Sequence, residues 1–335
     1  GGIVNILSLF NGISGLHLAC DKAGLKVDNC YYSEIDKYAN QVTEKHYPND
    51  VPLGDVTKWR EWDIDWSSID LVGAGFPCQA WSVAGQQLGD KDERGMLFWT
   101  TLEIIKHVLY FNPKAKFLME NVKMKKDFEE YITHHTTQAL GYVEKTLINS
   151  ALVSAQNRNR YYWTNFEVTQ PSDKGILLRD VLEDGVEAQG GAIRGRYNTD
   201  GSTSQKLECN NQEKTNSLTT VQKDNVVIYR PCERIKDGNQ GHIATATDIK
   251  GMDCIKRVYG QDGKAPTLTT MGGGHREPKV AVSDITYRKL TPTECARLQT
   301  FPDGWCESVV SKTQSYKAYG NSWTIDVIAH ILKGL

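Results

Sequence analysis

Residues 3–15 read IVNILSLFNGISG, in which a short apolar run passes directly into a glycine-containing turn. The run Ile3–Leu9 has the length and composition of a buried β-strand. Gly12 and Gly15 then open a helical stretch that we expect to continue to Ala23. A strand that leads through a turn into a helix is typical of α/β proteins, so this stretch predicts the first unit of an α/β sheet.

The same order of strand and helix recurs through the first half of the chain. Apolar runs predict further strands over Asn29–Ser33, Ile69–Ala74 and Lys116–Met119. Helical periodicity predicts helices over Lys37–His46 and Leu97–Tyr110, the second of which should end at Asn112-Pro113. This alternation predicts a doubly wound, mainly parallel sheet.

The composition changes near Pro171, after which the chain is rich in Gly, Thr, Asn and Asp as far as about Ile285. We expect a second, smaller domain here that is rich in β-strands and loops. Thr291-Pro292-Thr293-Glu294 is a capping box that should open a helix through Leu298. A last amphipathic helix over 323–332 should pack back on the first domain. The predicted division is therefore 1–170 plus 306–335 for one domain and 171–305 for the other.

Bulk properties exclude several classes of protein. No apolar run is long enough to span a bilayer, and the first residues show no signal-peptide pattern. With a formal net charge of −2, the protein lacks the excess of basic residues found in many dedicated DNA-binding proteins. The eight cysteines include no C-x-x-C pair, so we expect free thiols, no metal site and a reducing cytoplasm.

Three short motifs carry side chains suited to chemistry. Cys78 follows Gly75-Phe76-Pro77 at the expected carboxyl edge of a strand, where open α/β sheets bind ligands. Glu120 follows the next predicted strand, so thiol and carboxyl share one cleft if the two strands are neighbours. Arg158 and Arg160 point to the same side if their segment is extended. Taken singly, each motif is also compatible with a structural role: a buried cysteine, a capping acid and two surface arginines.

Together these motifs resemble the DNA (cytosine-5)-methyltransferase family over nearly the whole chain and in the family's order. Two departures are Ser14, where bacterial members often carry glycine, and Ala155, where the family usually has proline. Some runs are similar to the animal de novo enzymes, whereas the large second domain is closer to bacterial or phage members. The matching segments are Phe10–Gly15, Glu34, Gly54-Asp55-Val56, Pro77-Cys78-Gln79, Arg94–Phe98, Glu120-Asn121-Val122, Arg158-x-Arg160, Arg288–Arg297 and Tyr319–Ser322.

The resemblance implies a Rossmann-like methyltransferase sheet with a target-recognition domain. It implies methyl transfer from S-adenosylmethionine, leaving S-adenosylhomocysteine, to carbon 5 of a flipped cytosine in a specific duplex DNA sequence. Cys78 would add to carbon 6 of the ring as a thiolate. Glu120, kept neutral by burial, would donate to ring nitrogen 3. Arg158 and Arg160 would fix the base and support Glu120 or Cys78.

The resemblance also implies two sets of binding residues. The residues expected at the cofactor are Phe10, Asn11, Gly12, Ile13, Gly15, Glu34, Ile35, Asp55, Val56, Leu97, Asn321 and Ser322. The residues expected at DNA come from a lid over 82–94 and a recognition loop over 267–274, and they are Gln79, Ser82, Gln86, Arg94, Thr267, Thr269, Gly272 and Gly273. We expect no metal, no membrane contact and no obligate protein partner.

Three other functions compete with this hypothesis. A nicotinamide-dependent enzyme would share the sheet, but Phe10-x-Gly12-x-x-Gly15 lacks the first glycine of G-x-G-x-x-G. A methyltransferase acting on transfer RNA would share the first domain and carry a reduced second one. A non-enzymatic DNA-binding relative would usually lose the cysteine or the glutamate motif. The sequence leaves open whether the enzyme serves restriction–modification or a phage.

Overall fold

The computed structural model describes residues 2–77, 95–184, 190–197, 203–209, 225–227, 230–235, 241–283 and 286–335. They form two compact units. The first unit comprises 1–176, 266–272 and 295–335, and the second comprises 177–265 and 273–294. No helix in the described part of the chain is long and apolar enough to cross a membrane.

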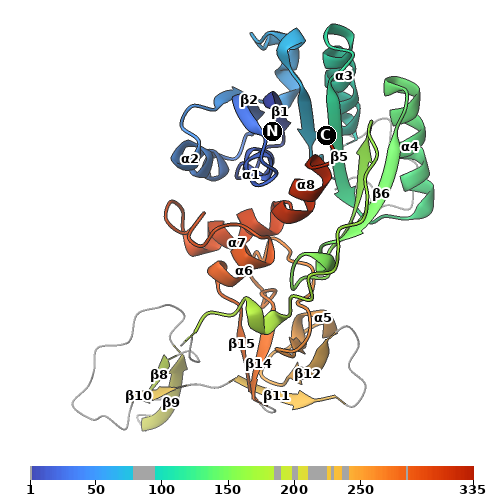
Figure 1. The fold of residues 1–335 in the computed structure, drawn as a ribbon. Helices are drawn as coiled ribbons and strands as arrows, with labels where there is room; N and C mark the ends of the chain where they lie inside the picture. The colour runs from blue at the N-terminus through green and yellow to red at the C-terminus, as the bar shows by residue number, and fades with distance from the viewer. Residues whose placement is uncertain are drawn as a thin grey trace. The chain divides into compact units, whose positions relative to one another are not determined.

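The first unit is built on a seven-stranded sheet with the order β3-β2-β1-β4-β5-β7-β6 (Figure 1). Strands β1 to β5 run parallel, and β7 pairs antiparallel with both β5 and β6. The strand order reverses between β1 and β4, which is where doubly wound sheets bind ligands. The strands are β1 (Ile3–Leu9), β2 (Lys26–Ser33), β3 (Val51–Gly54), β4 (Leu71–Ala74), β5 (Lys116–Val122), β6 (Glu144–Asn149) and β7 (Asn159–Thr164).

Helices cover both faces of this sheet because successive strand residues point to opposite sides. Val72 and Ala74 of β4 join a buried cluster with Phe98 and Leu102 of α3. Gly73, between them, faces the Leu16 side chain of α1 on the other side. The helices that lie wholly in the first unit are α1 (Gly15–Lys22), α2 (Lys37–His46), α3 (Met96–Phe111), α4 (Lys126–Leu140), α7 (Lys312–Asn321) and α8 (Ile325–Leu332), with short 3-10 turns at Val56–Glu61, Trp66–Ser68 and Ser150–Leu152. Helix α6 (Pro292–Leu298) begins in the second unit and ends in the first, and a 3-10 turn at Leu178–Asp180 belongs to the second unit.

The predicted α/β class is confirmed, and β1 and α2 have the predicted bounds. The predicted strand over Lys116–Met119 was too short, because β5 stays paired with β7 as far as Val122, which lies opposite Arg160. Glu120 therefore lies within the strand and not after it. The last helix begins later than predicted, at Ile325, since Thr324 has extended backbone at its start. Helices α4 and α7 and strands β3 and β6 were not predicted.

The second unit is rich in strands, as predicted. It holds a three-stranded sheet of β10, β8 and β9 and a closed barrel of β11 to β15. Glu294 is fully buried and accepts from both Nη atoms of Arg288 at 2.8 and 2.9 Å and from the Thr291 amide at 2.7 Å. The elements are β8 (Gly190–Tyr197), β9 (Thr203–Cys209), β10 (Asn225–Val227), β11 (Arg230–Arg234), β12 (His242–Ala246), α5 (Asp253–Lys256), β13 (Arg257–Tyr259), β14 (Lys279–Ser283) and β15 (Thr286–Lys289).

The units do not follow the predicted domain boundaries in every segment. Residues 266–272 and 295–305, predicted in the second domain, cluster with the first unit. One reason is hydrogen bonding, since the Leu268 amide donates to Gln156 Oε1 at 3.0 Å and the Leu298 carbonyl accepts from Gln156 Nε2 at 3.1 Å. Which segments fold as independent domains stays a prediction.

Candidate active site

The turn after β1 has an unusual backbone. Phe10, Gly12 and Ser14 all have positive φ, at 54°, 56° and 71°. This conformation suits glycine and is costly for other residues. Ser14 stays there with its hydroxyl bonded to Thr43 Oγ1 at 2.8 Å. The Gly12 amide donates to Glu34 Oε1 at 2.8 Å, which ties the turn to the end of β2.

Glu34 organises the next stretch of the same sheet edge. Its Oε2 accepts from the amides of Ile35 and Asp36 at 2.9 and 3.0 Å. Ile35 itself is 79 % exposed, which is unusual for a large apolar side chain. The glycine turn, the Glu34 carboxylate and an exposed apolar surface therefore lie together at the carboxyl ends of β1 and β2.

Asp55 lies at the end of β3, beside this edge. It accepts from the amide and hydroxyl of Thr57 at 2.9 and 2.8 Å, and these bonds lower the pKa of its carboxyl. The predicted cofactor residues fall into two sets by burial. Asn11, Ile13, Gly15, Val56 and Ser322 are buried, whereas Phe10, Gly12, Glu34, Ile35, Asp55, Leu97 and Asn321 keep exposed surface.

The carboxyl of Glu120 is held by an ion pair and a hydrogen bond from different segments. Glu120 lies opposite Tyr162 in the β5–β7 ladder, so Arg160 is its diagonal neighbour on the same face. Arg160 Nε lies 3.1 Å from Glu120 Oε1, and Trp323 Nε1 donates to Oε2 at 2.8 Å. Both charged side chains are nearly buried, with 13 % and 12 % of their surfaces exposed.

The condition for a shared cleft, that the two strands are neighbours, is met because β4 pairs directly with β5. Asn121 strengthens the link after the ladder ends, since its Nδ2 donates to the Phe76 carbonyl at 3.3 Å. The end of β4 that leads to Pro77 therefore lies beside Glu120. Cys78 itself lies outside the described residues, as do Gln79, Ser82, Gln86 and Arg94.

Arg158 has different surroundings from those expected. It precedes β7, and no hydrogen bond or ion pair to Glu120 is found among the described residues; its guanidinium instead donates to backbone carbonyls. The acceptors are Leu268 at 3.1 Å, Gly320 at 3.1 Å and Ser322 at 2.9 Å. Burial, and then repulsion from Arg160, lowers the pKa of Arg158 to about 9. Within the described ranges the side chains of the two arginines thus have different hydrogen-bond and ion-pair partners, and only Arg160 lies in β7.

The described part of the predicted recognition loop alternates between buried and exposed residues. Leu268 and Met271 are buried, whereas Thr267, Thr269, Gly272 and Gly273 are exposed. The Leu268 amide and carbonyl bind Gln156 and Arg158, respectively. The four residues predicted to contact DNA are thus exposed, although the Thr267 hydroxyl donates to the Asn157 carbonyl at 2.6 Å and the Thr269 hydroxyl accepts from the Met271 amide at 3.3 Å.

Four residues with evident roles around this site were not predicted. Trp323 binds Glu120, and Gly75 leaves room for its indole. Gln156 and Gln299 form a fully buried pair, with Gln156 Nε2 donating to Gln299 Oε1 at 3.1 Å. Their signal in the sequence was polar or small residues beside known motifs, which does not distinguish them from ordinary neighbours.

One group of potential metal ligands occurs in the described chain, formed by His17, Cys30 and Asp50. His17 Nδ1 lies 2.8 Å from Asp50 Oδ2, and the Cys30 thiol also bonds to Asp50. Burial, followed by the charge of Asp50, raises the pKa of Cys30 well above its usual value. The three side chains are thus joined by hydrogen bonds, and the expected absence of a metal stays a prediction.

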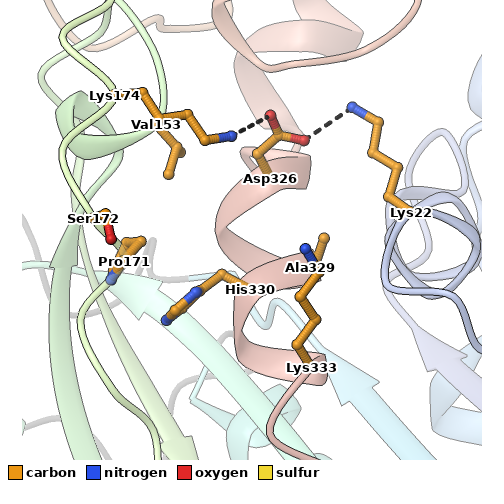
Figure 2. A pocket seen from close by; sticks show the side chains of 9 residues that line it. All are labelled: Lys22, Val153, Pro171, Ser172, Lys174, Asp326, Ala329, His330 and Lys333. Carbon is orange, nitrogen blue, oxygen red and sulfur yellow. Dashed lines mark hydrogen bonds and ion pairs between the residues drawn. The ribbon is translucent and has the colours of Figure 1, made fainter.

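A separate cavity of about 350 Å³ contains none of the predicted site residues (Figure 2). Asp326 lies between Lys22 and Lys174 in it, at 3.0 and 3.5 Å. Lys22 ends α1 and Lys333 caps α8, where positive charge stabilises helix C-termini. Its basic lining is thereby explained by helix ends.

The chain is similar in sequence and in fold to known DNA methyltransferases. The profile of the C-5 cytosine-specific DNA methylase family matches residues 4–335. Type II methyltransferase M.HhaI of Haemophilus parahaemolyticus is 30 % identical over 98 % of this chain and 93 % of its own. Type II methyltransferase M.HpaII of Haemophilus parainfluenzae is 30 % identical, with 96 % and 86 % covered. The orphan methyltransferase M.SPBetaI of Bacillus phage SPbeta is 28 % identical, with 99 % and 97 % covered.

Solved structures share the fold at lower identity. A putative DNA modification methyltransferase from an E. coli prophage has a TM-score of 0.60 at 20 % identity, with 99 % of this chain and 98 % of that chain covered. The S. pombe Dnmt2 methyltransferase has a TM-score of 0.61 at 16 % identity, with 99 % and 97 % covered. Since the family profile covers nearly the entire sequence and relatives of 30 % identity align end to end, the chain belongs to the C-5 cytosine-specific DNA methylase family.

Proposed function

We propose that this DNA cytosine methyltransferase acts on duplex DNA through a covalent bond between Cys78 and carbon 6 of a flipped-out cytosine. The observation that carries the proposal is the position of Glu120 beside the end of β4, the strand that leads into Pro77 and Cys78. A strand end that carries a thiol and a neighbouring strand that carries a carboxyl can act on one ring from two sides.

The sheet edge fits S-adenosylmethionine. The Cβ position of Gly12 is open, with no atom within 4 Å, so a ligand can approach the backbone there. Glu34 offers carboxylate oxygens to ribose hydroxyls, and exposed Ile35 offers an apolar surface to adenine. Asp55 and Asn321 would add polar contacts, while buried Asn11, Ile13, Gly15, Val56 and Ser322 would shape the backbone around the ligand. When bound, the cofactor supplies an electrophilic methyl group on a sulfonium.

The residues of the chain would prepare the cytosine for that methyl group. The Cys78 thiolate adds to carbon 6 and pushes electron density toward ring nitrogen 3, where the protonated Glu120 carboxyl donates a hydrogen bond. Carbon 5 thereby becomes nucleophilic and takes the methyl group. A base, for which an ordered water is our candidate, then removes the carbon 5 proton, and Cys78 leaves by elimination. Arg160 stabilises the Glu120 carboxyl from β7.

The target base must leave the helix for this reaction, at a cost of a few kcal/mol in lost stacking and pairing. We propose that the segment 82–94, with Ser82, Gln86 and Arg94, closes over it, together with Gln79. Exposed Thr267, Thr269, Gly272 and Gly273 would face DNA from the recognition loop. We propose a cytoplasmic location and a role in restriction–modification or phage DNA modification, as the names of several relatives indicate for those proteins.

A covalent trap tests the proposal directly. Duplex DNA that carries 5-fluorocytosine in place of the cytosine that the enzyme methylates should remain bound to the native enzyme through Cys78, because fluorine at carbon 5 blocks the final elimination. Mass spectrometry of the tryptic peptide should locate the bond. Cys78→Ala should abolish both trapping and methylation but keep cofactor binding. Trapping at another residue, or methylation by Cys78→Ala, would overturn the mechanism.

A separate experiment tests whether the substrate is DNA or RNA. Methyl transfer should be assayed on duplex DNA and on transfer RNA under the same conditions, with bisulfite sequencing to report the DNA sites. We expect activity on DNA, and activity on RNA alone would assign the enzyme to a different substrate.

A further inference from the structure

The indole of Trp323 lies where three parts of the candidate site meet. Its Nε1 donates to Glu120 Oε2 at 2.8 Å. A Cβ atom on Gly75, at the end of β4, would lie only 2.7 Å from that nitrogen. A Cβ atom on Gly15, the first residue of α1, would lie 3.9 Å from Cε3 on the opposite side of the ring, which is an ordinary contact distance. The indole therefore fits beside the end of β4 because Gly75 lacks a side chain, and its other side faces the start of α1.

Two side chains hold the Glu120 carboxyl together. The Arg160 guanidinium forms an ion pair with Oε1, and the Trp323 indole donates a hydrogen bond to Oε2. The last torsion of a glutamate is broad, so one donor alone would leave the carboxyl plane free to turn. Arg160 comes from β7 and Trp323 from the segment between α7 and α8, so the plane is fixed from two independent elements.

We infer that Trp323 is a positioning residue for Glu120, whose indole N–H holds the carboxyl in the plane needed for its hydrogen bond to the cytosine ring. The inference rests on the proposed role of Glu120. Trp323 acts on the reaction through that carboxyl. Its ring also faces Gly15 at the start of α1, so one side chain lies between the predicted cofactor residues there and Glu120.

Trp323→Phe tests this role, because it removes the N–H and keeps a ring between the two glycines. Trp62→Phe is the matched control, since Trp62 is 9 % exposed and its Nε1 has no hydrogen-bond partner in the described chain. The hydrogen bond to the Glu120 carboxyl is lost only in the first variant, so its single-turnover methylation rate should fall about tenfold or more. Affinity for S-adenosylhomocysteine, measured by calorimetry, should change less than about threefold. The control should keep the native rate.

A double-mutant cycle with Glu120→Gln separates this inference from the proposed function. If Trp323 acts through the carboxyl, Trp323→Phe should add no further loss in the Glu120→Gln background. A native rate in Trp323→Phe, or losses that multiply in the double variant, would overturn the inference. Native activity in Glu120→Gln would instead overturn the proposed role of Glu120.

A second variant keeps the test valid if Trp323→Phe does not fold, as judged by circular dichroism. Gly75→Ala keeps the tryptophan and its indole N–H but pushes the indole away from the carboxyl, since the new Cβ would lie 2.7 Å from Trp323 Nε1. We expect a similar loss of rate, again absent in the Glu120→Gln background. An unchanged rate in a folded Gly75→Ala protein would contradict the inference.

Discussion

Arg158 Nη2 and the Ser322 carbonyl oxygen are 2.9 Å apart, although 164 residues separate them in the chain. The same guanidinium binds Leu268 and Gly320, so one buried cation joins the start of β7, the predicted recognition loop and the end of α7. Sequence similarity alone assigned Arg158 to the base and its surroundings. Its partners in the fold assign it to the support of the loops that carry the predicted cofactor and DNA residues.

Arg158→Lys should therefore destabilise the protein. The planar guanidinium serves three carbonyls in different directions, and a single ammonium cannot reach them all. Leaving buried acceptors unpaired should lower the free energy of unfolding by about 3 kcal/mol, measured by urea titration. Arg60→Lys is the control, since Arg60 is 67 % exposed in a surface ion pair with Glu103. Native stability with a large loss of methylation in Arg158→Lys would favour a direct catalytic role.

Gly320→Ala should disrupt the contact between α7 and the recognition loop. A Cβ atom at Gly320 would lie 1.9 Å from the Thr269 carbonyl oxygen, a distance that only backbone movement could relieve. We expect the free energy of unfolding to fall by about 3 kcal/mol. This loss would occur although alanine ordinarily stabilises a helix more than glycine does. Gly272→Ala, whose Cβ would meet nothing within 4 Å, should leave stability unchanged. Equal stabilities for the two variants would contradict the predicted clash.

The sequence predicted those parts of the fold that depend on local pattern. Strand β1 and helix α2 have strong apolar periodicity or clear caps, and both bounds were correct. Helix α4 was missed because its residues KDFEEYITHHTTQAL are mostly polar, although Gly141, with φ of 87°, marks its end. Helix α7 was missed for the same reason, although Ser311 caps it by accepting from the Gln314 amide at 3.3 Å.

The site was predictable only where a motif carries its own chemistry. Glu120 and Arg160 came together because neighbouring strands place them on one face. Trp323 could not be predicted, because its partner lies 203 residues away and the contact depends on the absence of a side chain at Gly75. Likewise, the carbonyl partners of Arg158 exist only once the loops are folded.

Thiol labelling should distinguish the described cysteines. Cys254 is exposed, whereas Cys20, Cys30, Cys295 and Cys306 are buried. Burial raises the pKa of both Cys20 and Cys306 to about 12, so neither supplies the thiolate that alkylating agents attack. Iodoacetamide at about pH 8 should therefore label Cys254 in the native protein and spare those four until denaturant is added. Peptide mass spectrometry measures this, and early labelling of Cys20 would contradict the burial.

The cap of α2 should make stability depend on pH in the acid range. Asp36 accepts from the Tyr38 and Ala39 amides at 2.8 and 3.1 Å. Burial alone would raise the pKa of Asp36, but the Ala39 and Tyr38 amides and the Lys317 ammonium outweigh it and lower the pKa. A carboxyl with a lowered pKa stabilises the fold above its unfolded pKa of about 3.9, and the stabilisation is lost as pH falls through the lower folded value.

Two substitutions at Asp36 separate the cap from its charge. Asp36→Ala should cost about 1 kcal/mol near neutral pH because it removes the cap. Asp36→Asn keeps a side-chain acceptor for the helix but cannot titrate. As pH falls from about 5 to about 3, the native protein loses stability that this variant does not lose, so the stability of the variant relative to the native protein should increase. Urea unfolding at the two pH values measures the difference. A constant gap between the native protein and Asp36→Asn would show that the charge of Asp36 contributes nothing, and that the cap acts through hydrogen bonding alone.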